Sequence, residues 1–528
     1  MMQEINLRVD PATAADNDKI ARQAASALKI DRSRIKAVKI TRRSIDARQR
    51  HVMVNLTVRI YVDEIPSSLS LITPVKYGNV TDAPQVVVVG AGPAGLFAAL
   101  RLIELGLRPI VLERGKDVDS RRKDMARISR ENVVDPDSNY CFGEGGAGAF
   151  SDGKLYTRSK KRGSIEKILT VFHQHGADES ILVDAHPHIG TDRLPGVIKA
   201  MREQIVRSGG DVLFGCRVTD LLIADNEVKG VTCADGSEYH GPVILATGHS
   251  ARDIYMMLDR REITIEPKGI AVGVRLEHPQ HLIDSIQYHS PDGRGKYLPA
   301  AEYSMLTRVD DRAVYSFCMC PGGFIIPAAS APGQLVVNGM SPSSRGTKWA
   351  NSGMVVEVLP EDIPSYDKYG ALKMMKYQED IETLFWFDAK ETQNAAAQRM
   401  VDFVEGRDSK TLPPTSYAPG IHCARIDRLL PEPISRRLRR GFREFGRKAK
   451  GFLTNEAVLI GDETRTSSPV RIPRDKDNLA HIGISKLFPC GEGAGYAGGI
   501  VSAAIDGERC AEAAARSLGV SPSDDSAE

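Results

Sequence analysis

Residues 86–113 read VVVVGAGPAGLFAALRLIELGLRPIVLE, and this stretch decides the fold class. The four leading valines predict a short strand that is buried on both faces. Three glycines follow with GxGxxG spacing, and the apolar residues from Pro93 to Leu105 then recur at helical spacing. A second apolar run ends at Glu113. Strand, glycine turn, helix, strand and acid follow one another in the order of a dinucleotide-binding βαβ unit.

Each of the three glycines has its own physical role in such a unit. Gly90 permits the tight turn, Gly92 leaves room for a pyrophosphate at the backbone, and Gly95 lets the helix pack close to the strand. The helix N-terminus offers free N–H groups and a partial positive charge to the phosphates. Glu113 lies 23 positions after Gly90. Its carboxylate is placed to bind an unphosphorylated ribose, which argues against NADP in this site.

Composition excludes several function classes. The 528 residues carry 70 basic and 68 acidic side chains, so nothing global demands nucleic acid or a membrane surface as partner. No apolar run has transmembrane length, and the first residues show no basic-then-apolar signal pattern, so we expect a cytoplasmic protein. The eight cysteines show no zinc-site spacing, so we expect thiols and no metal.

The pattern along the chain predicts a small module, a dinucleotide-binding domain and an insertion. Residues 1–75 read as strand, helix and two strands, which favours a ferredoxin-like or similar α+β module. The dinucleotide-binding domain should run over 83–264 and be completed by 483–518, with a cap or substrate domain inserted at 265–482. We expect the tail, 519–528, to be disordered.

Further glycine-rich turns stand far along the chain. Residues 141–154 read CFGEGGAGAFSDGK, which excludes a regular helix or strand and favours close approach of a ligand; the alternative is a flexible linker. Residues 487–518 repeat the opening pattern, with a strand, a glycine turn and a helix that starts at Ile500. The buried run 242–246 should return the chain to the same sheet edge at the Thr247–Gly248 turn.

These segments together resemble those of the two-dinucleotide-binding-domain flavoproteins, and most closely the bacterial FAD-dependent, NAD-utilizing dehydrogenase family of uncharacterised proteins. The resemblance rests on VVVVGAGPAGLFAAL with LERG at 112–115, FGEGGAGAFSDGKL at 142–155, ILATGHSARD at 244–253, TSSPVRIPRD at 466–475 and PCGEGAGYAGGI at 489–500. These motifs span about four-fifths of the chain. The resemblance implies an α/β fold: a Rossmann-like, glutathione-reductase-like FAD-binding domain, an inserted α+β cap and the N-terminal module.

The resemblance also implies non-covalently bound FAD, with NAD(P)H as an optional transient donor. Val218 would face the adenine through its backbone. Gly491 and Glu492 stand where many such flavoproteins have Gly-Asp beside the ribityl chain, and Glu is one methylene longer than Asp. The predicted cofactor-binding residues are Gly90, Ala91, Gly92, Pro93, Ala94, Gly95, Glu113, Arg114, Gly145, Gly146, Ala147, Gly148, Val218, Thr247, Gly248, Gly491, Glu492, Gly498, Gly499 and Ile500.

The leading hypothesis is an FAD-dependent oxidoreductase that passes hydride between FAD and an unidentified organic substrate. No catalytic residue is assigned, although Lys154 is a candidate for contact with the flavin or a substrate carboxylate. Cys318 and Cys320 alternate along a predicted strand, which favours two buried thiols on one face over a redox pair.

Two alternatives belong to other function classes. The first is an RNA-associated flavoprotein that binds or modifies tRNA through the N-terminal module and the basic amphipathic helix 435–450. The usual role of such a helix is a solvated surface. The second alternative is a non-catalytic scaffold that FAD stabilises. DNA is not expected as a partner.

Overall fold

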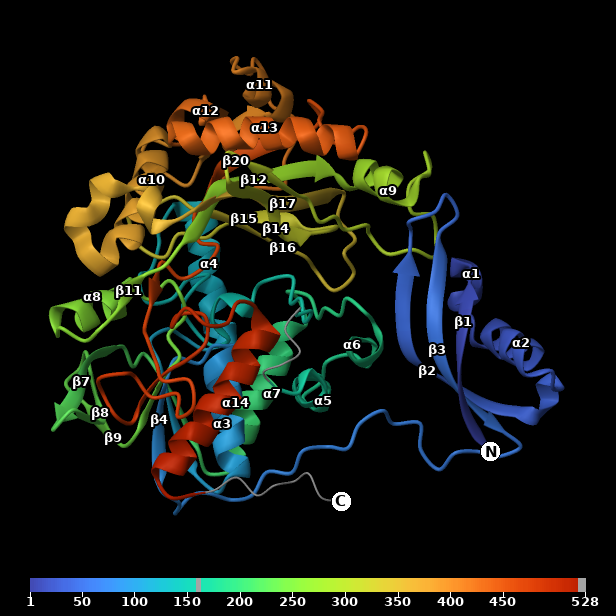
Figure 1. Cartoon of the computed structure of the whole chain (residues 1–528), viewed down its shortest axis with the longest axis horizontal. Helices are drawn as coiled ribbons and strands as arrows, with labels where there is room; N and C mark the ends of the chain where they lie inside the picture. The colour runs from blue at the N-terminus through green and yellow to red at the C-terminus, as the bar shows by residue number, and fades with distance from the viewer. Residues whose placement is uncertain (158–162, 521–528) are drawn as a thin grey trace.

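The computed structural model describes residues 1–157 and 163–520, which are arranged as three bodies (Figure 1). A small N-terminal module lies at the right of Figure 1, a lower body surrounds a parallel sheet, and an upper body surrounds a larger mixed sheet. Most of the tail that the sequence predicts to be disordered, 521–528, lies outside the described residues. Among the described helices, none combines the length and apolarity that a bilayer crossing requires.

The lower body is built on five parallel strands. Their order across the sheet is β22 (Leu487–Pro489), β10 (Val243–Leu245), β4 (Gln85–Val89), β5 (Arg108–Glu113) and β6 (Asp211–Phe214). Val86 and Val88 pack into one apolar core, and Val87 and Val89 into another on the opposite face. The prediction of a strand buried on both faces is confirmed, because β-branched side chains alternate between two covered faces.

Helices cover one face of this sheet and a meander covers the other. The helices are α3 (Pro93–Glu104), α5 (Ile165–Gln174), α7 (Leu194–Arg207) and α14 (Ile500–Ser517). The meander is β7 (Val218–Ala224), β8 (Glu227–Cys233) and β9 (Glu238–His240), with α8 (Arg252–Arg260) beside it. The central strand β4 has β5 on one side and β10 on the other, so a crevice opens at their carboxyl ends, where ligands bind in such sheets.

The upper body is built on a mixed sheet. Its order is β13 (Leu306–Val309), β14 (Arg312–Cys320), β17 (Trp349–Val358), β12 (Ile270–Pro279), β20 (Val458–Glu463), β18 (Ala395–Arg399) and β19 (Ile421–Cys423). A two-stranded sheet, β15 (Phe324–Pro327) and β16 (Val337–Met340), lies beneath it. Above the mixed sheet in Figure 1 lie α11 (Met400–Glu405), α12 (Ile426–Leu429) and α13 (Glu432–Lys448), with α9 (Gln280–Tyr288) at its right end and α10 (Lys373–Asp388) at its left end.

The chain crosses between the two bodies at a pair of short strands. It enters the upper body after β11 (Glu266–Pro267) and returns through β21 (Val470–Arg471), and these two strands pair antiparallel. The upper body is therefore inserted in sequence between β10 and β22, which are neighbours in the parallel sheet. This return brings the last glycine turn back beside the first.

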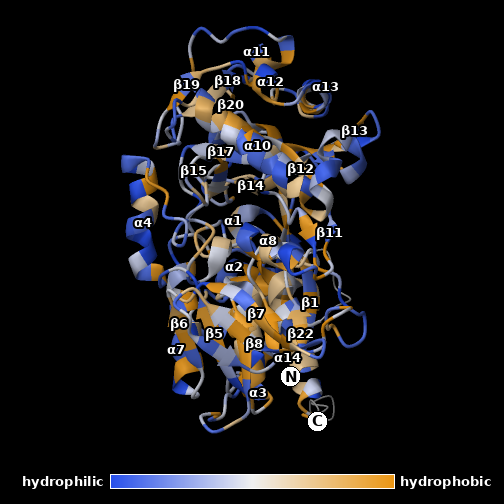
Figure 2. Ribbon diagram, turned by 90° about the vertical axis from the view of Figure 1, so that its left-hand side faces the viewer, coloured by the Kyte–Doolittle hydropathy of each residue, from blue (hydrophilic) through white to orange (hydrophobic). Residues whose placement is uncertain are grey.

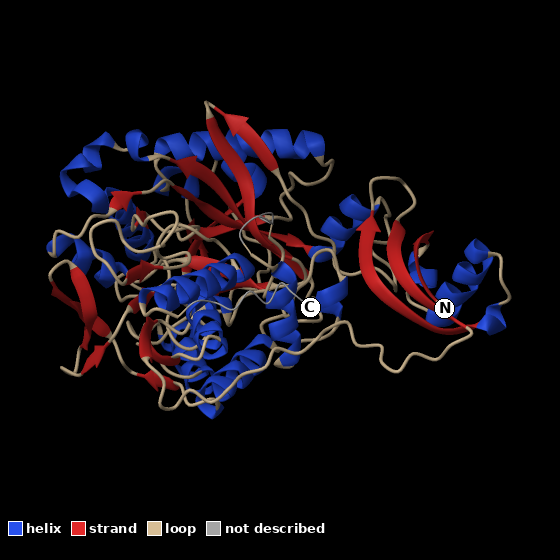
Figure 3. Cartoon of the chain, turned by 60° about the horizontal axis from the view of Figure 1, so that its bottom comes forward, coloured by secondary structure: helices blue, strands red, loops and turns tan. Residues whose placement is uncertain are grey.

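The N-terminal module is a three-stranded antiparallel sheet with one main helix (Figure 3). Its elements are β1 (Met2–Val9), α1 (Pro11–Ala14), α2 (Asn17–Leu28), β2 (Ile35–Asp46) and β3 (Met53–Val62), in sheet order β1-β3-β2. Between residues 1 and 84 there is no second helix of comparable length and no fourth strand, so only the first four of the six elements of a ferredoxin-like pattern are present. Lys39 pairs with Glu179 at 2.6 Å and Arg43 with Asp184 at 2.6 Å, which docks the module on the lower body.

One long helix lies in a stretch for which the sequence analysis predicts no element. α4 (Val118–Glu131) is mostly charged and appears largely polar on the flank of the lower body (Figure 2). Val118, Met125 and Ile128 are its buried apolar residues. Three buried apolar residues over three turns give a weak periodic signal, because polar side chains occupy almost all of the remaining positions.

Candidate active site

The three glycine-rich turns meet at one cavity between the lower and upper bodies. The turn after β4, the loop 143–153 and the turn before α14 all contribute to its lining. They also approach one another directly: a side-chain carbon added at Gly146 would lie 3.3 Å from Gly92 Cα, and one at Gly148 would lie 3.4 Å from Ile500 Cγ1. Segments about 50 and 400 residues apart in sequence therefore form one cradle.

Most of the predicted cofactor-binding residues line this cavity. They are Gly90, Gly92, Pro93, Ala94, Glu113, Arg114, Gly146, Ala147, Gly148, Val218, Thr247, Gly248, Glu492, Gly499 and Ile500. The remainder, which are Ala91, Gly95, Gly145, Gly491 and Gly498, stand beside the cavity without lining it. Gly95 packs against the backbone of Gly90, and Ala91 is fully buried, so their roles are in the turn itself.

The first turn has the shape that a pyrophosphate needs. Gly90 has φ +105°, and a side-chain carbon there would lie 2.5 Å from Ala246 O. A carbon at Gly95 would lie 1.9 Å from Gly90 O, whereas one at Gly92 would meet nothing closer than 4.0 Å. α3 begins at Pro93 with no side chain capping its first N–H groups. This uncapped helix end faces open space in the cavity and fits an anionic group.

Glu113 ties the first turn to the glycine loop. Its carboxylate accepts hydrogen bonds from Ala91 N at 2.9 Å, Gly115 N at 2.9 Å and Gly143 N at 3.0 Å. The side chain is almost fully buried and still borders the cavity. A carboxylate has about four lone-pair positions, so one remains for a ligand hydroxyl.

The next part of the cavity is bordered by Arg114, Cys216, Arg217 and Val218. Arg114 forms ion pairs with Asp137 at 2.7 Å and Asp253 at 2.9 Å, and its guanidinium lies 4.2 Å from the Phe142 ring centre. Sequence reasoning missed Phe142 as a wall residue, although the aromatic side chains within the glycine loop were a signal for it. Together these residues line a partly polar slot of the cavity.

The third turn brings a carboxyl group with an altered proton affinity. Burial raises the pKa of Glu492 to about 7, against the opposing effect of the Lys268 cation. His249 Nδ1 lies 3.9 Å from Glu492 Oε2. Burial and then the Arg465 guanidinium lower the pKa of His249 to about 4, so the imidazole is neutral at neutral pH. α14 begins at Ile500 without a side-chain cap, and Gly499 and Ile500 line the cavity, so a second uncapped helix start borders it.

The upper body closes the cavity with Phe317, Cys318 and Asn338. The expectation of two buried thiols on one strand face is wrong. A β-bulge interrupts β14 between Phe317 and Cys320, and Cys318 adopts φ +45°. Cys318 therefore borders the cavity while Cys320 is fully buried. Lys154 also lines the cavity, and its ammonium donates to Met319 O within the bulge.

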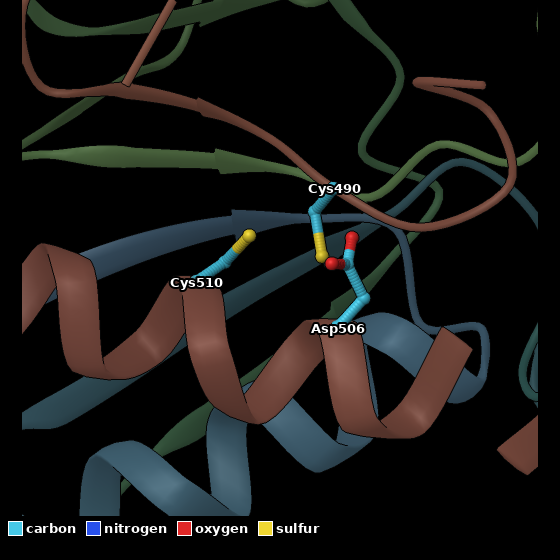
Figure 4. A group of neighbouring side chains, drawn as sticks. All are labelled: Cys490, Asp506 and Cys510. Atoms are coloured by element: carbon cyan, nitrogen blue, oxygen red, sulfur yellow. The ribbon is translucent and has the colours of Figure 1, made fainter. Parts of the chain in front are cut away.

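Cys490, Asp506 and Cys510 form a compact group behind the third turn (Figure 4). Their ligand atoms lie within 4.8 Å of one another, but Arg474 supplies the cation there. Its guanidinium contacts Asp506 at 2.6 and 2.9 Å and Cys510 Sγ at 3.4 Å, and Asp506 also accepts from Gly491 N at 2.8 Å. We interpret the group as the support of the Gly491 turn.

The basic helix α13 uses its arginines within the upper body. Arg439 pairs with Asp427, Arg440 pairs with Asp310 at 2.5 Å, and Arg443 donates to Val404 O at 3.0 Å. Leu438, Phe442 and Phe445 are fully buried beneath it. These arginines are engaged with carboxylates and carbonyls, which does not favour the RNA alternative.

Comparison with known proteins gives the family. An uncharacterised protein of Clostridium beijerinckii is 38% identical over 529 residues, which covers 97% of each chain. The chain belongs to the same family as that protein. Family models match this chain as "FAD-dependent protein, C-terminal domain-like" over 269–466, "FAD dependent oxidoreductase" over 193–316, "FAD binding domain" over 85–124 and a domain of unknown function over 1–61.

Other known proteins are more distantly similar to this chain. Protein FixC of Escherichia coli is 27% identical over 215 residues, 38% of this chain and 45% of FixC. The flavin-dependent brominase Bmp2 aligns with TM-score 0.37 and 14% identity over 82% of this chain and 79% of its own. A geranylgeranyl bacteriochlorophyll reductase-like protein of Thermoplasma acidophilum aligns with TM-score 0.33 and 13% identity over 83% and 81%. From the family models, the predictions of an oxidoreductase class and of FAD as the cofactor are confirmed.

Proposed function

We propose that this protein is an FAD-dependent dehydrogenase that passes hydride between a non-covalently bound FAD and a small organic substrate under the upper body. The observation that carries the proposal is the single cavity that three glycine turns and the upper body share. The turns offer backbone N–H groups and let a ligand approach the backbone closely, which suits a long cofactor. The upper body supplies the opposite wall of the cavity.

Within the cavity we assign the parts of FAD to the turns that suit them. The uncapped start of α3 with Gly92 suits the pyrophosphate, Glu113 suits the adenosine ribose, and the slot at Val218 suits the adenine. The start of α14 at Gly499 suits the electron-rich edge of the flavin, because a helix N-terminus stabilises negative charge. When bound there, FAD supplies the hydride chemistry.

The chain's own residues have three tasks in this proposal. Glu492, with a pKa of about 7, holds or releases a proton beside the reacting centre near neutral pH. Asn338 and Lys154 offer polar contacts to a substrate. Phe317 and the rest of the upper body's underside exclude water, which strengthens the polar contacts inside the cavity.

The donor of electrons is either the organic substrate or NAD(P)H. GxGxxG spacing recurs at 143–148 and 493–498, but in the described part of the chain neither stretch belongs to a complete strand, turn, helix and strand unit with a following acid. A nicotinamide would therefore bind under the upper body without a Rossmann unit of its own. We propose the same placement, beside the flavin, for either donor, and we propose the upper body as the substrate domain.

Anaerobic titration of the purified protein tests this function. We expect FAD to be released on denaturation, and flavin absorbance to bleach when NADH, NADPH or a reducing substrate is added. A purified protein without FAD would refute the proposal. Bleaching by a candidate organic substrate but by neither nicotinamide would identify the substrate itself as the donor.

A further inference from the structure

The end of β14 is built in an unusual way where it borders the cavity. Phe317 pairs with Gly353 and Cys320 with Asn351, so two residues, Cys318 and Met319, stand opposite one. Cys318 takes a left-handed backbone conformation with φ +45°, which is costly for a residue with a side chain. Such strain persists where surrounding contacts impose it, and bulges of this kind redirect a side chain.

Arg275 imposes the strained conformation from beneath. Its side chain is fully buried, and Nη2 donates to Cys318 O at 2.7 Å and contacts Cys320 Sγ at 3.3 Å. The same guanidinium forms an ion pair with Glu463 at 3.2 Å, and its Nε donates a hydrogen bond to Asn351 Oδ1 at 2.9 Å. A buried cation thus lies against both cysteines of the Cys-Met-Cys segment.

The two sulfur atoms differ in their chemistry. The hydrogen bond from the Cys320 thiol, together with the Arg275 and Lys154 cations, holds the pKa of Cys318 below its usual value against the effect of burial. The same hydrogen bond and burial raise the pKa of Cys320 well above its usual value. A thiolate at the cavity surface with a protonated thiol behind it is the arrangement in which one sulfur attacks and the other resolves.

We propose that Cys318 and Cys320 are a redox-active dithiol that reduces a small disulfide in the cavity, and that the reduced FAD cofactor then restores the dithiol. This inference rests on the proposed function and names its substrate class. The sequence favours two buried thiols over a redox pair because it predicts a regular strand, whereas the positions of the two sulfur atoms are determined by the bulge.

The steps balance as follows. The Cys318 thiolate attacks one sulfur of the disulfide R–S–S–R, which forms a mixed disulfide and releases RS⁻. Cys320 then attacks Cys318 Sγ, which forms the Cys318–Cys320 disulfide and releases a second RS⁻. The proton of Cys320 and one from solvent convert the two leaving thiolates to thiols. Two electrons from reduced FAD, which becomes oxidised, cleave the protein disulfide and return one thiolate and one thiol.

The short spacing of the two cysteines favours reversibility. In a regular strand, residues two apart have Cα atoms about 6.6–6.8 Å apart, at the upper limit for a disulfide. Here the bulge bends the strand, and Cys320 Sγ lies 3.3 Å from Cys318 O. A disulfide in so small a ring is strained, and strained disulfides have higher potentials and are more readily reduced.

Electron counting on the FAD-containing protein tests the proposal. The protein is treated with bis(2-hydroxyethyl) disulfide, desalted and titrated anaerobically with dithionite. We expect four electrons per FAD for the wild type, two for the flavin and two for the disulfide. Cys318→Ser should take up only two, because no Cys318–Cys320 disulfide can form. Cys320→Ser is assayed by peptide mass instead, because a probe held on Cys318 as a mixed disulfide would itself accept two electrons. Cys423→Ser, at an exposed thiol that does not line the cavity, should still take up four.

Thiol titration in denaturant and peptide mass give readouts that do not depend on flavin. The wild type has eight cysteines and should show six free thiols after oxidation, with the loss on the peptide that contains Cys318 and Cys320. In Cys320→Ser the probe should remain attached to Cys318 as a mixed disulfide. An FAD-containing wild type that takes up two electrons and keeps all eight thiols would overturn this inference and leave the dehydrogenase proposal standing. Absence of FAD would overturn the dehydrogenase proposal instead, and the thiol count would still decide the dithiol.

Discussion

Glu113 Oε2 accepts a hydrogen bond from the backbone N–H of Ala91 at 2.9 Å, so the acid that ends β5 holds the turn that follows β4. Its second oxygen holds Gly115 and Gly143, and the latter begins the glycine loop. One carboxylate thus joins two of the three turns of the cradle. The residue proposed to bind the ribose also determines the positions of the turns that contact the rest of the cofactor.

Replacing Glu113 by Gln should therefore weaken FAD binding, by at least the contribution of one hydrogen bond to a charged group. A hydrogen bond to a charged group contributes about 1.5–3 kcal/mol. We expect the dissociation constant of FAD to rise between about tenfold and a hundredfold. Flavin fluorescence during titration of the flavin-free protein measures it. Glu227→Gln, at a carboxylate that pairs with Lys486 at 2.8 Å outside the cavity, is the control and should bind FAD as the wild type does.

Adding a methyl group at two glycines of the first turn should change different properties of the protein, FAD affinity at one and folding stability at the other. At Gly92 the methyl group meets nothing closer than 4.0 Å in the protein but borders the cavity, so Gly92→Ala should fold normally and lose FAD affinity. At Gly95 the methyl group would lie 1.9 Å from Gly90 O, so Gly95→Ala should destabilise the flavin-free protein by about 3 kcal/mol.

Urea denaturation of the flavin-free variants, followed by FAD titration, separates the two effects. A Gly92→Ala protein that binds FAD with wild-type affinity would contradict the assignment of the pyrophosphate to this turn. Equal loss of folding stability in both variants would show that Gly92 is structural as well.

The first βαβ unit was predictable because its determinants are local. The valines of β4, the glycine spacing and the acid at the end of β5 all lie within about 30 residues. The other two turns could also be recognised from local sequence. The turn before Ile500 repeats the pattern of a strand, a glycine turn and a helix, and the loop 141–154 has too many glycines for regular structure.

The upper wall of the cavity was not predictable in the same way. The bulge at Cys318 depends on Arg275 and on the partner strand β17, and no property of the Cys-Met-Cys segment itself indicates it. The alternation of apolar residues there favours a regular strand, which would place both thiols on one face. α4 escaped prediction for a different reason, because Met125 and Ile128 are too few to make its buried stripe stand out among charged residues.

A buried ion-pair cluster joins the two bodies, and its removal should be strongly destabilising. Glu382 of α10 pairs with Arg252 of α8 at 2.8 Å and with Arg465, after β20, at 2.9 Å. Glu382→Ala leaves two buried guanidiniums uncompensated and should cost about 3–5 kcal/mol. Glu379→Gln, at a partly exposed carboxylate 3.9 Å from Arg252, is the control and should cost less than about 1 kcal/mol. Urea denaturation followed by tryptophan fluorescence measures both, since Trp386 lies on the same helix as Glu382.

The contribution of the same cluster to the free energy of unfolding should decrease in acid. Although burial opposes it, the guanidiniums of Arg252 and Arg465 lower the pKa of Glu382 to about 2. A lowered folded-state pKa contributes stability above the unfolded value, near 4.5, and that stability is lost as pH falls toward 2. Between pH 5 and pH 3 the wild type should therefore lose more stability than Glu382→Gln does. Parallel loss in both proteins would assign the acid sensitivity to other carboxylates.

Glu492 should have the opposite pH dependence. Burial raises its pKa from 4.5 to about 7, so the folded protein keeps a proton that the unfolded chain has lost. Stability from this group is fully present below pH 4.5 and is lost as pH rises through about 7. Glu492→Gln cannot titrate, so its stability relative to the wild type should increase between pH 5 and pH 8. Since 29% of the side chain is exposed, solvent reduces the effect, and we expect about 1–2 kcal/mol.

Urea denaturation of the flavin-free wild type and Glu492→Gln at pH 5 and pH 8 measures this difference. Glu463, whose pKa burial also raises to about 7, is present in both proteins, so its contribution cancels. If Glu492 is also the group that holds a proton beside the flavin, the rate of flavin reduction should change near pH 7 in the wild type and lose that dependence in the variant. If Glu492→Gln keeps the wild-type change of stability with pH, another group is the one that titrates. If the variant loses that change but keeps the pH dependence of the reduction rate, another group transfers the proton.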